Sequence, residues 1–290
     1  MTGADVIPEG LRPLLFSLAY RMVGGVGDAE DLVQEAFLRL HREDAEVQSP
    51  KAFLTTVVTR LAIDHLRSAR VRREAYVGQW LPEPLVAAPP ASDQVVHDET
   101  LSLAFLTLLE RLTPVERAVY VLHELFAYSH DEVAAVVGKS AANCRQILAR
   151  ARRHVDAGRP RFEPSRERRE ALLARFLDAV GAGDVDALVG LLAADAISYA
   201  DGGGKARATL KPIYGAAKVA RLWARLGTQR DAFTVLAADV NGQPGVVGLQ
   251  DGVAVAVLSV DVAGDRVQSV WAVVNPDKLA RVPTDLVQSR

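Results

Sequence analysis

Residues 112–155, LTPVERAVYVLHELFAYSHDEVAAVVGKSAANCRQILARARRHV, contain three helix starts in close succession. Thr113 and Glu116 form a capping box, in which each side chain serves the backbone of the other residue, and a proline stands at the first helical position between them. Ser129 and Glu132 form a second capping box, which opens a short helix. These signals predict two helices ahead of the basic helix that ends the stretch.

The third helix completes the motif. Gly138 is suited to end the second helix, and Ser140 is suited to cap the third. The apolar stripe of the third helix comprises Cys144, Ile147, Leu148, Ala151 and Val155. A helix, a turn with glycine and a helix with a basic outer face predict a helix-turn-helix. We interpret Cys144 as a small core residue; it is the only cysteine, which excludes an intramolecular disulfide and a multi-cysteine zinc site.

The outward side chains of the third helix are suited to DNA. In a recognition helix the N-terminal turns enter the major groove and read base edges, while basic residues further along bind phosphates. The candidates for DNA contact here are Ser140, Ala141, Ala142, Asn143, Arg145, Gln146, Arg150, Arg152 and Arg153. Among them, Arg145 can pair with guanine, and Asn143 or Gln146 can pair with adenine.

The charge pattern supports two nucleic-acid contacts rather than one. The chain has a net charge of −2, yet residues 51–73 hold six Lys or Arg and one acid, and residues 139–161 hold seven and one. The segments around these two are acidic. This pattern is expected if each basic segment meets phosphate while its neighbours meet a protein. The alternative interpretation is two solvated helix ends.

Residues 11–75 read as helices with little strand signal. In residues 27–43, GDAEDLVQEAFLRLHRE, we expect Asp28 to be the N-cap of a helix whose apolar stripe faces inward. A second helix is expected to begin at Pro50 and to run to Glu74. The outward polar residues of this second helix are Arg60, Asp64, His65, Arg67, Arg70, Arg72 and Arg73.

The rest of the chain divides into a linker and an α+β segment. Several prolines between Gln79 and Gln94 predict extended backbone. Within this linker lies WLPEP, residues 80–84, which is either a local hydrophobic anchor or a docking segment for a partner domain. After a second linker, residues 157–165, two helix patterns lead to four β-rich runs separated by turns such as Asn241-Gly242. Helices first and a sheet afterwards predict an α+β domain.

Taken together, these motifs resemble those of the extracytoplasmic-function (ECF) sigma factors, which are bacterial transcription initiation factors. Residues 8–75 resemble region 2, and residues 100–156 resemble region 4. The resemblance rests on RLAIDHLR (60–67) and on the order LTPVER, YSHDEVA and a basic helix. WLPEP, DGGGK (201–205) and NPDKL (275–279) resemble a subgroup that carries a C-terminal SnoaL-like extension.

The resemblance implies a multidomain fold. We expect two all-α DNA-binding modules, namely region 2 over residues 1–75 and a region 4 helix-turn-helix over 100–158, joined by a linker over 76–99. An α+β SnoaL-like cone domain is expected over 162–290. Such a chain binds core RNA polymerase through the β′ and β subunits, recognises the minus-ten and minus-thirty-five promoter elements, and is regulated here by its own C-terminal domain.

The resemblance also assigns roles to residues. The loop from about 41 to 49 and the outward face of the 50–74 helix would open the minus-ten element and capture an extruded base. Threonines stand at 55, 56 and 59, with Phe53 and His65 as the nearest rings, so hydrogen bonds are expected to contribute more than stacking to holding that base. The core-polymerase contact falls on Asp28, Glu30, Asp31, Gln34 and Glu35, for which a solvated helix face is the alternative.

The three short motifs are expected to form a regulatory contact between the C-terminal domain and the linker. Its residues are Trp80, Leu81, Pro82, Glu83, Pro84, Asp201, Gly202, Gly203, Gly204, Lys205, Asn275, Pro276, Asp277, Lys278 and Leu279. The glycines allow close approach of another backbone, and the prolines reduce the entropy lost on docking. The alternative is a plain turn at DGGGK and a strand terminator at NPDKL. The sign of the regulation is left open.

Other functions remain as alternatives. SnoaL-like cones often enclose a pocket in which Asp and His perform acid-base chemistry, yet residues 162–290 contain no histidine. Asp201 or Asp239 could serve, so catalysis and ligand sensing stay open beside an operator-binding regulator that does not recruit polymerase. We expect no enzyme activity, cofactor, metal or membrane span and a cytoplasmic location; an attached regulatory domain is compatible with the lack of a separate anti-sigma factor.

Overall fold

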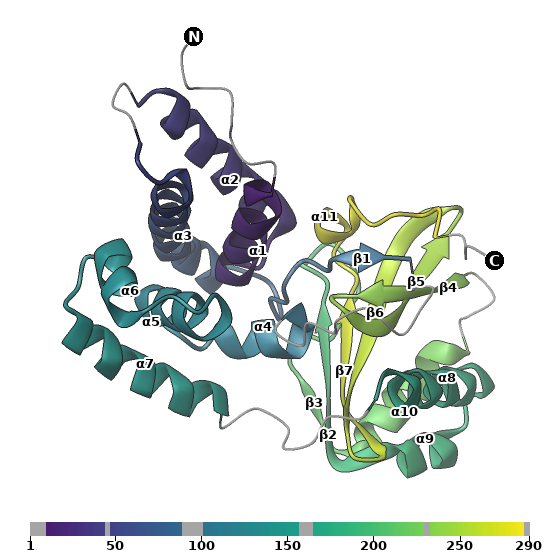
Figure 1. Ribbon diagram of the computed structural model, residues 1–290. Coiled ribbons are helices and arrows are strands. Elements are labelled where there is room, and N and C mark those ends of the chain that lie inside the picture. Colours follow the sequence, from purple (N-terminus) through teal and green to yellow (C-terminus); the bar gives the residue numbers. More distant parts are fainter. Residues whose placement is uncertain (1–9, 44–46, 89–100, 157–164, 229–232, 287–290) are drawn as a thin grey trace. The chain divides into compact units, whose positions relative to one another are not determined.

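The computed structural model describes residues 10–43, 47–88, 101–156, 165–228 and 233–286, without the side chains of residues 70–74. The chain forms two compact units, each built from two stretches of sequence (Figure 1). The first unit comprises residues 1–75 and 106–159, and the second comprises 76–105 and 160–290. In the described part of the chain, no helix is long and apolar enough to cross a membrane.

The first unit begins with three helices, α1 (Leu11–Val23), α2 (Val26–His41) and α3 (Pro50–Glu74). The expected start of α3 at Pro50 is confirmed, but the predicted N-cap of α2 was wrong by three residues. Gly25 has extended backbone and precedes the helix, so Asp28 lies inside the first turn instead of capping it. An acid in the first turn still stabilises a helix by interacting with its dipole.

The helix-turn-helix of the first unit follows the signals in the sequence. It contains α5 (Pro114–Tyr120), α6 (His130–Val137) and α7 (Ala141–Asp156). Both predicted capping boxes are present, and Gly138 ends α6 in the left-handed conformation with φ of 65°. The predicted apolar stripe of α7 is buried in full. The backbone amide of Asn143 donates to the Ser140 hydroxyl at 3.2 Å, which confirms the third cap.

One element of the first unit was not predicted. After α5 the chain continues as a short π-helix, η2 (Val121–Leu125), where the sequence suggested a continuous α-helix. The amide of Phe126 donates to the carbonyl of Val121 at 3.2 Å, five residues back. The π-helix brings His123 against His130, with ring centroids 4.3 Å apart. Such π-turns have no local sequence signature comparable to a capping box.

The second unit is built around a seven-stranded sheet with the order β1-β4-β5-β6-β7-β2-β3. The four predicted β-rich runs are β4 (Thr234–Val240), β5 (Gln243–Gln250), β6 (Val253–Ala263) and β7 (Arg266–Val273). The other strands are β1 (Val86–Ala87), β2 (Leu192–Asp201) and β3 (Ile213–Tyr214). The expectation that helices come first and the sheet afterwards was wrong in one respect, because β2 lies between two helices and pairs in parallel with β7.

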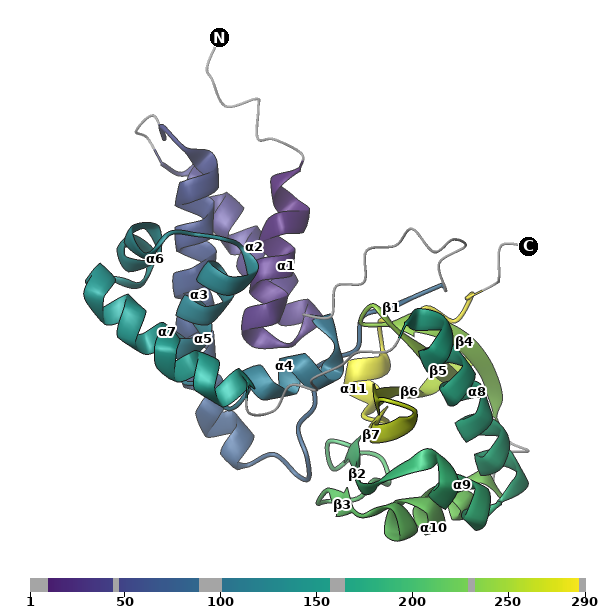
Figure 2. The ribbon, with the colours of Figure 1, turned by 60° about the horizontal axis from the view of Figure 1, so that its bottom comes forward.

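Both faces of this sheet are covered. The helices α8 (Arg166–Ala182), α9 (Val185–Leu191) and α10 (Ala216–Gly227) lie together beside it (Figure 2), and their apolar side chains form one core with Val267 and Val270. A second core joins Leu81 of the linker to Val257 and Trp271 of the sheet, with α11 (Pro276–Leu279) on its border. The linker therefore belongs to the hydrophobic core of the second unit.

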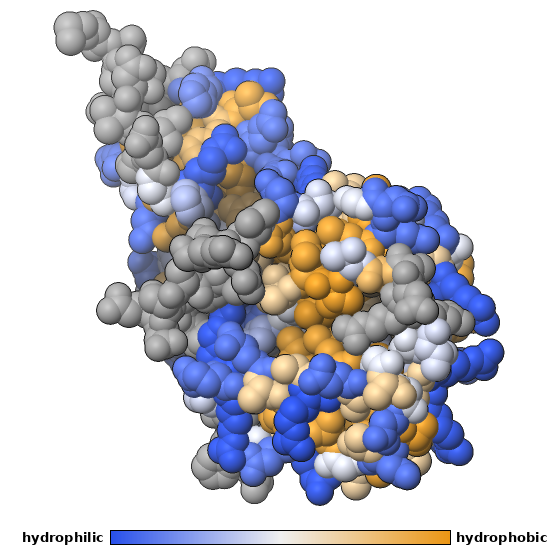
Figure 3. All heavy atoms as spheres, turned by 90° about the vertical axis from the view of Figure 1, so that its right-hand side faces the viewer, coloured by the Kyte–Doolittle hydropathy of each residue, from blue (hydrophilic) through white to orange (hydrophobic). Residues whose placement is uncertain are grey.

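Part of the apolar surface of the second unit is exposed to solvent. Val253 at the start of β6 is 63% exposed, and Phe233 just before β4 is 41% exposed. Figure 3, the view from the right-hand side of Figure 1, shows an apolar area bordered by hydrophilic residues. The turns that join these strands follow the prediction: Asn241 and Gly242 have φ of 55° and 75°, as a two-residue hairpin turn requires.

Candidate functional site

The outer face of α7 presents the expected set of polar side chains. Asn143, Arg145 and Gln146 are exposed on its N-terminal turns, and Ala142 is exposed beside them. Ser140 acts as the cap, and Ala141 is half-buried. Arg150 and Arg153 are exposed further along the helix. A groove of duplex DNA can therefore reach the side chains that were expected to read bases.

Arg152 differs from the other basic residues of α7. Its guanidinium donates to the carboxylate of Glu124 at 2.7 Å from Nη2 and at 3.2 Å from Nε. The hydrogen bond to this carboxylate raises the pKa of Arg152. The sequence placed Arg152 among the phosphate contacts, but in the structure it connects the recognition helix to η2. A phosphate would have to compete with Glu124 for this side chain.

The outward residues of α3 are not all free for DNA. The Arg60 guanidinium donates to the carbonyls of Val136 at 3.0 Å and Ala135 at 3.3 Å, in the last turn of α6. Arg67 pairs with Asp64 at 3.0 Å. His65 lies 3.6 Å from the carboxylate of Asp28. The side chains of Arg70, Arg72 and Arg73, and part of the 41–49 loop, lie outside the described residues.

Further contacts hold the helices of residues 10–75 against those of residues 106–156. Thr55 is fully buried, and its hydroxyl lies 3.0 Å from the hydroxyl of Tyr128. Arg117, which the sequence did not single out, is also buried. Its guanidinium donates to the carbonyls of Leu109 at 2.9 Å and Met22 at 2.6 Å, and it pairs with Glu110 at 2.7 Å.

The acidic face of α2 is exposed as expected. Asp28, Glu30, Asp31 and Gln34 are exposed, whereas Glu35 is half-buried and pairs with Arg39 at 2.8 Å. Leu38 lies on the same side of the helix, one turn after Gln34, and is 43% exposed. A single exposed leucine is normal on a protein surface, so Leu38 does not by itself mark an interface. The polar pattern alone did not single it out.

A fully buried carboxylate holds the linker in the second unit. Asp201, at the end of β2, has no exposed surface. It accepts hydrogen bonds from the Tyr76 hydroxyl at 2.6 Å, the Leu81 amide at 2.9 Å and the Gly203 amide at 3.0 Å. Lys278 of α11 completes its set of partners with an ion pair of 2.7 Å. We call these residues, Tyr76, Leu81, Asp201 and Lys278, the linker latch.

Lys278 connects all three sequence motifs. Besides pairing with Asp201, its ammonium donates to the carbonyl of Leu81 and lies 4.2 Å from the centre of the Trp80 ring. An ammonium above an aromatic face is attracted by the ring quadrupole. Nearby, the side-chain amide of Asn275 donates to the Tyr76 hydroxyl at 2.9 Å. WLPEP, DGGGK and NPDKL therefore meet at one place in the second unit.

The glycines of DGGGK are needed for this close approach. Gly203 and Gly204 have φ of 59° and 71°, in the left-handed region that favours glycine. A Cβ at Gly203 would lie 2.3 Å from the side-chain nitrogen of Asn275, and one at Gly204 would lie 3.0 Å from Val77. Lys205 pairs with Asp277 at 2.5 Å on the exposed side of the loop. The DGGGK loop thus lies close to Val77 of the linker and to Asn275.

The remainder of the linker continues along the sheet. Leu81 is 1% exposed, and Pro82 and Pro84 are also buried, with Glu83 half-buried between them. Next, β1 pairs antiparallel with β4 at the edge of the sheet. The side-chain oxygen of Asn241 accepts a hydrogen bond from the Leu85 amide at 3.1 Å, which holds this end of the linker on the sheet. Neither Tyr76 nor Asn241 lies in a motif that the sequence had singled out for docking.

The two acids considered for acid-base chemistry are both engaged elsewhere. Asp201 is surrounded by the donors of the linker latch. Asp239 pairs with Arg166 at 2.9 Å and accepts from the Gly242 amide at 2.7 Å. A third acid, Asp261, is distinguished by its environment, because burial raises its pKa from 3.8 to about 6 while Arg169 partly offsets that rise. No histidine lies in this part of the sequence to complete a pair.

Two family models match the helices whose geometry has just been described. The model for sigma-70 region 2 matches residues 9–72, and the model for sigma-70 region 4 matches residues 102–155. The first of these regions contains the basic helix α3, and the second contains α7 with its exposed polar face. The fold and the site thus define a sigma-type transcription initiation factor.

Relatives of known name extend the match to the whole chain. The ECF RNA polymerase sigma factor SigJ of Mycobacterium tuberculosis is 41% identical, over 95% of this chain and 93% of that protein. A probable ECF RNA polymerase sigma factor of the same species, SigI, is 33% identical over 95% and 94%. The crystal structure of M. tuberculosis SigJ has a TM-score of 0.78 and 37% identity, covering 96% of this chain and 98% of that one. The chain belongs to the ECF family of RNA polymerase sigma factors.

Membership of this family confirms the expected fold and the expected class of function. The chain has the two helical sigma regions and an α+β C-terminal domain, and the SigJ structure matches 96% of the chain. It is a promoter-recognising transcription initiation factor, and sigma factors work with core RNA polymerase and promoter DNA. The alternative of a helix-turn-helix regulator that works without polymerase is therefore set aside.

Proposed function

We propose that the C-terminal domain regulates initiation by fixing the linker between the two sigma regions. The observation that carries this proposal is the buried Asp201 carboxylate, because all of its partners come from the linker, the DGGGK loop or α11. The linker covalently joins the two regions that must each reach their own promoter element. A domain that binds part of the linker shortens the part that stays free, and this limits the positions that the two sigma regions can reach.

Transcription with purified core polymerase tests this proposal. The full chain is compared with a truncation that ends at Arg159 and with Trp80→Ala, which removes the ring beneath Lys278. Trp223→Phe is the matched control, because its ring lies in the other core of the second unit. We expect the truncation to change promoter output strongly and Trp80→Ala to change it in the same direction. Output that stays unchanged in both variants contradicts the proposal.

We further propose that the exposed face of α7 reads the minus-thirty-five element, with Asn143, Arg145 and Gln146 as the residues that contact bases. The outward residues of α3 then serve the minus-ten element. Arg60 is included, although in this structure it bonds to α6. We also propose that the chain consists of a region 2 module, a linker, a region 4 module and a regulatory domain.

The exposed acidic face of α2 is proposed as the surface that binds core polymerase, through its β′ and β subunits. Asp31, Gln34 and Leu38 share one side of the helix. Changing Asp31 to Lys and Leu38 to Ser should abolish assembly with core polymerase in native gel electrophoresis. The control is Asp186→Lys with Val189→Ser, which likewise changes an exposed acid and an exposed aliphatic residue, here on α9. If the double variant assembles with core polymerase at wild-type affinity, the acidic face of α2 is only a solvent-exposed surface.

We propose a regulatory rather than an enzymatic role for the second unit, because Asp201 and Asp239 are both held in structural contacts. An attached domain that controls the linker performs the role that a separate anti-sigma factor would otherwise have. The chain would act in the cytoplasm, where it meets RNA polymerase.

A further inference from the structure

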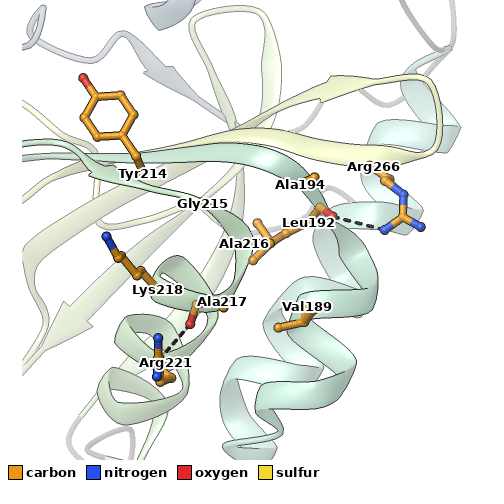
Figure 4. A pocket seen from close by; sticks show the side chains of 10 residues that line it. All are labelled: Val189, Leu192, Ala194, Tyr214, Gly215, Ala216, Ala217, Lys218, Arg221 and Arg266. Carbon is orange, nitrogen blue, oxygen red and sulfur yellow. Dashed lines mark hydrogen bonds between the residues drawn. The ribbon is translucent and has the colours of Figure 1, made fainter.

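The second unit carries an open cleft that none of the roles above uses. The cleft has a volume of about 730 Å³ and lies where the end of α9 and the start of β2 face the β3–α10 junction. Val189 and Leu192 line one wall, and Tyr214 and Lys218 line the other (Figure 4). It is separate from the interior between the sheet and the helices, which Phe176, Val219 and Val267 fill with side chains.

The charged residues that line this cleft are all cations. They are Lys218 and Arg221 on α10 and Arg266 at the start of β7. Arg266 is fixed because one of its nitrogens donates to the carbonyls of Gly190 at 2.9 Å and Leu192 at 3.1 Å. Arg221 donates from Nε to the carbonyl of Ala217 at 3.0 Å, and no described residue is seen to bond to its two terminal nitrogens.

No carboxylate among the described lining residues balances these cations. Asp195 follows the lining residue Ala194, but its carboxylate accepts a hydrogen bond from Gln268 at 3.3 Å. Asp186 lies on α9, outside the lining. Like charges gathered around a concave surface repel one another and raise the local concentration of anions. The first turn of α10 forms part of the wall and adds the positive end of a helix dipole.

Apolar side chains lie open in the same cleft. Tyr214 is 60% exposed and Val189 is 37% exposed, although both are large apolar residues. Leu192 also lines the cleft, but it is only 1% exposed and belongs to the core beneath it. Covering apolar surface contributes roughly 25 cal/mol per Å² to binding a ligand that has a matching apolar part. The cleft therefore offers two kinds of interaction, with an anion at its rim and with a hydrocarbon group at its base.

We infer that this cleft binds a small amphipathic anion, consisting of a carboxylate or similar head group and a short apolar body. The head group pairs with Lys218 and Arg221, and the apolar body covers Val189 and Tyr214. Binding at this place does not depend on the proposed roles of the linker or of the DNA-binding helices.

Titration of the full chain with 8-anilinonaphthalene-1-sulfonate, a fluorescent amphipathic anion, tests the inference. We expect saturable binding that octanoate displaces and inorganic phosphate does not. Lys218→Gln with Arg221→Gln should weaken binding at least tenfold. The matched control, Arg175→Gln with Arg207→Gln, changes the net charge equally at exposed cations outside the cleft and should bind like the wild type.

A second variant separates loss of the site from loss of the fold. Tyr214→Ala keeps every charge and removes one apolar wall, so it should weaken binding of the dye and of octanoate together. Circular dichroism of all variants should match that of the wild type, because the altered side chains are exposed. The inference is overturned if the charge variant binds as tightly as its control, if octanoate fails to compete, or if phosphate competes equally well.

Discussion

Asp201 and Asp277 provide two aspartate–lysine pairs that differ mainly in burial. The Asp201–Lys278 pair is buried, with 0% and 11% exposed side chains, whereas the Asp277–Lys205 pair is 60% and 57% exposed. Breaking a buried pair leaves an uncompensated charge and typically costs about 3–5 kcal/mol. An exposed pair contributes about 0–1 kcal/mol, because water screens it.

We therefore predict that Asp201→Asn lowers the free energy of unfolding of the second unit by roughly 3 kcal/mol. Asp277→Asn should lower it by less than about 1 kcal/mol. Urea titration followed by tryptophan fluorescence measures this unit selectively, since Trp80, Trp223 and Trp271 all lie in it. Equal effects of the two substitutions would show that the linker latch does not stabilise the docked linker.

Asp261 gives a prediction about pH. Its pKa in the folded chain is raised from 3.8 to about 6 by burial, so the folded state holds the proton more tightly than the unfolded state. The stability that Asp261 contributes is therefore fully present below about pH 4 and is lost as the pH rises through 6. Asp261→Asn should raise the free energy of unfolding by about 1–3 kcal/mol at pH 7.5, with little difference at pH 4. Lower stability of the variant at both pH values would contradict this interpretation.

Single residues were predictable where a motif named them. DGGGK and NPDKL indicated Asp201 and Asn275, and the structure brings both to the linker. Tyr76 and Arg117 were not predicted, although they are central to their contacts. Their partners Asp201 and Met22 lie 125 and 95 residues away in the sequence. A local pattern carries no information about such a partner.

At the scale of elements, α7 allows the clearest test of base reading. Arg145 is exposed near the N-terminal end of the helix, and Arg153 is exposed two turns later. Arg145→Ala should cost about 1–3 kcal/mol and relax preference at one position of the upstream element. Arg153→Ala should weaken binding to all sequences alike. Arg152 is a poor control, because it is paired with Glu124.

Binding of holoenzyme to matched and mismatched promoter fragments measures both effects. The promoter is one selected from a random library by the wild-type holoenzyme. If Arg145→Ala lowers the affinity for matched and mismatched fragments by the same factor, Arg145 contacts phosphate instead of a base.

Elements with strong end signals were predicted well, and elements defined by distant pairing were not. The two capping boxes fixed the starts of α5 and α6, since their hydrogen bonds span only three residues. In contrast, β2 was missed, because it follows α9 directly and its parallel partner β7 lies about 70 residues later. The two-residue strands β1 and β3 exist only by pairing at the edges of the sheet.

For the whole molecule, the main surprise is how the chain divides. The sequence separated a linker from the domains on either side, whereas residues 76–105 form one compact unit with the C-terminal domain. The two sigma regions share the other unit, with buried polar contacts such as that of Arg117 with Met22. The chain divides in this way because the linker docks on the C-terminal domain. Composition alone could not decide whether WLPEP is a local anchor or a docking segment.

Packing of the two sigma regions in one unit has a consequence for promoter binding. The minus-ten and minus-thirty-five elements lie about 25 base pairs apart, which corresponds to roughly 85 Å of duplex at ~3.4 Å per base pair. Arg60 of α3, however, is within hydrogen-bond distance of α6, the first helix of the predicted helix-turn-helix pair. If α3 and α7 bind the two elements as proposed, the two regions must separate before both elements are bound. The fraction of closed molecules lowers the apparent affinity for the promoter.

Tyr128→Phe should shift this equilibrium toward the open form. The substitution removes the hydroxyl that lies 3.0 Å from the buried Thr55 hydroxyl and keeps the ring. One hydrogen bond contributes about 1 kcal/mol, so we expect promoter binding by holoenzyme to rise by up to about fivefold if most molecules are closed. The matched control is Tyr214→Phe, whose ring is exposed in the second unit. Fluorescence anisotropy of a labelled promoter fragment measures the affinity. An affinity for Tyr128→Phe at or below that of the wild type would show that this contact does not oppose opening, because it would then be present in the bound form as well.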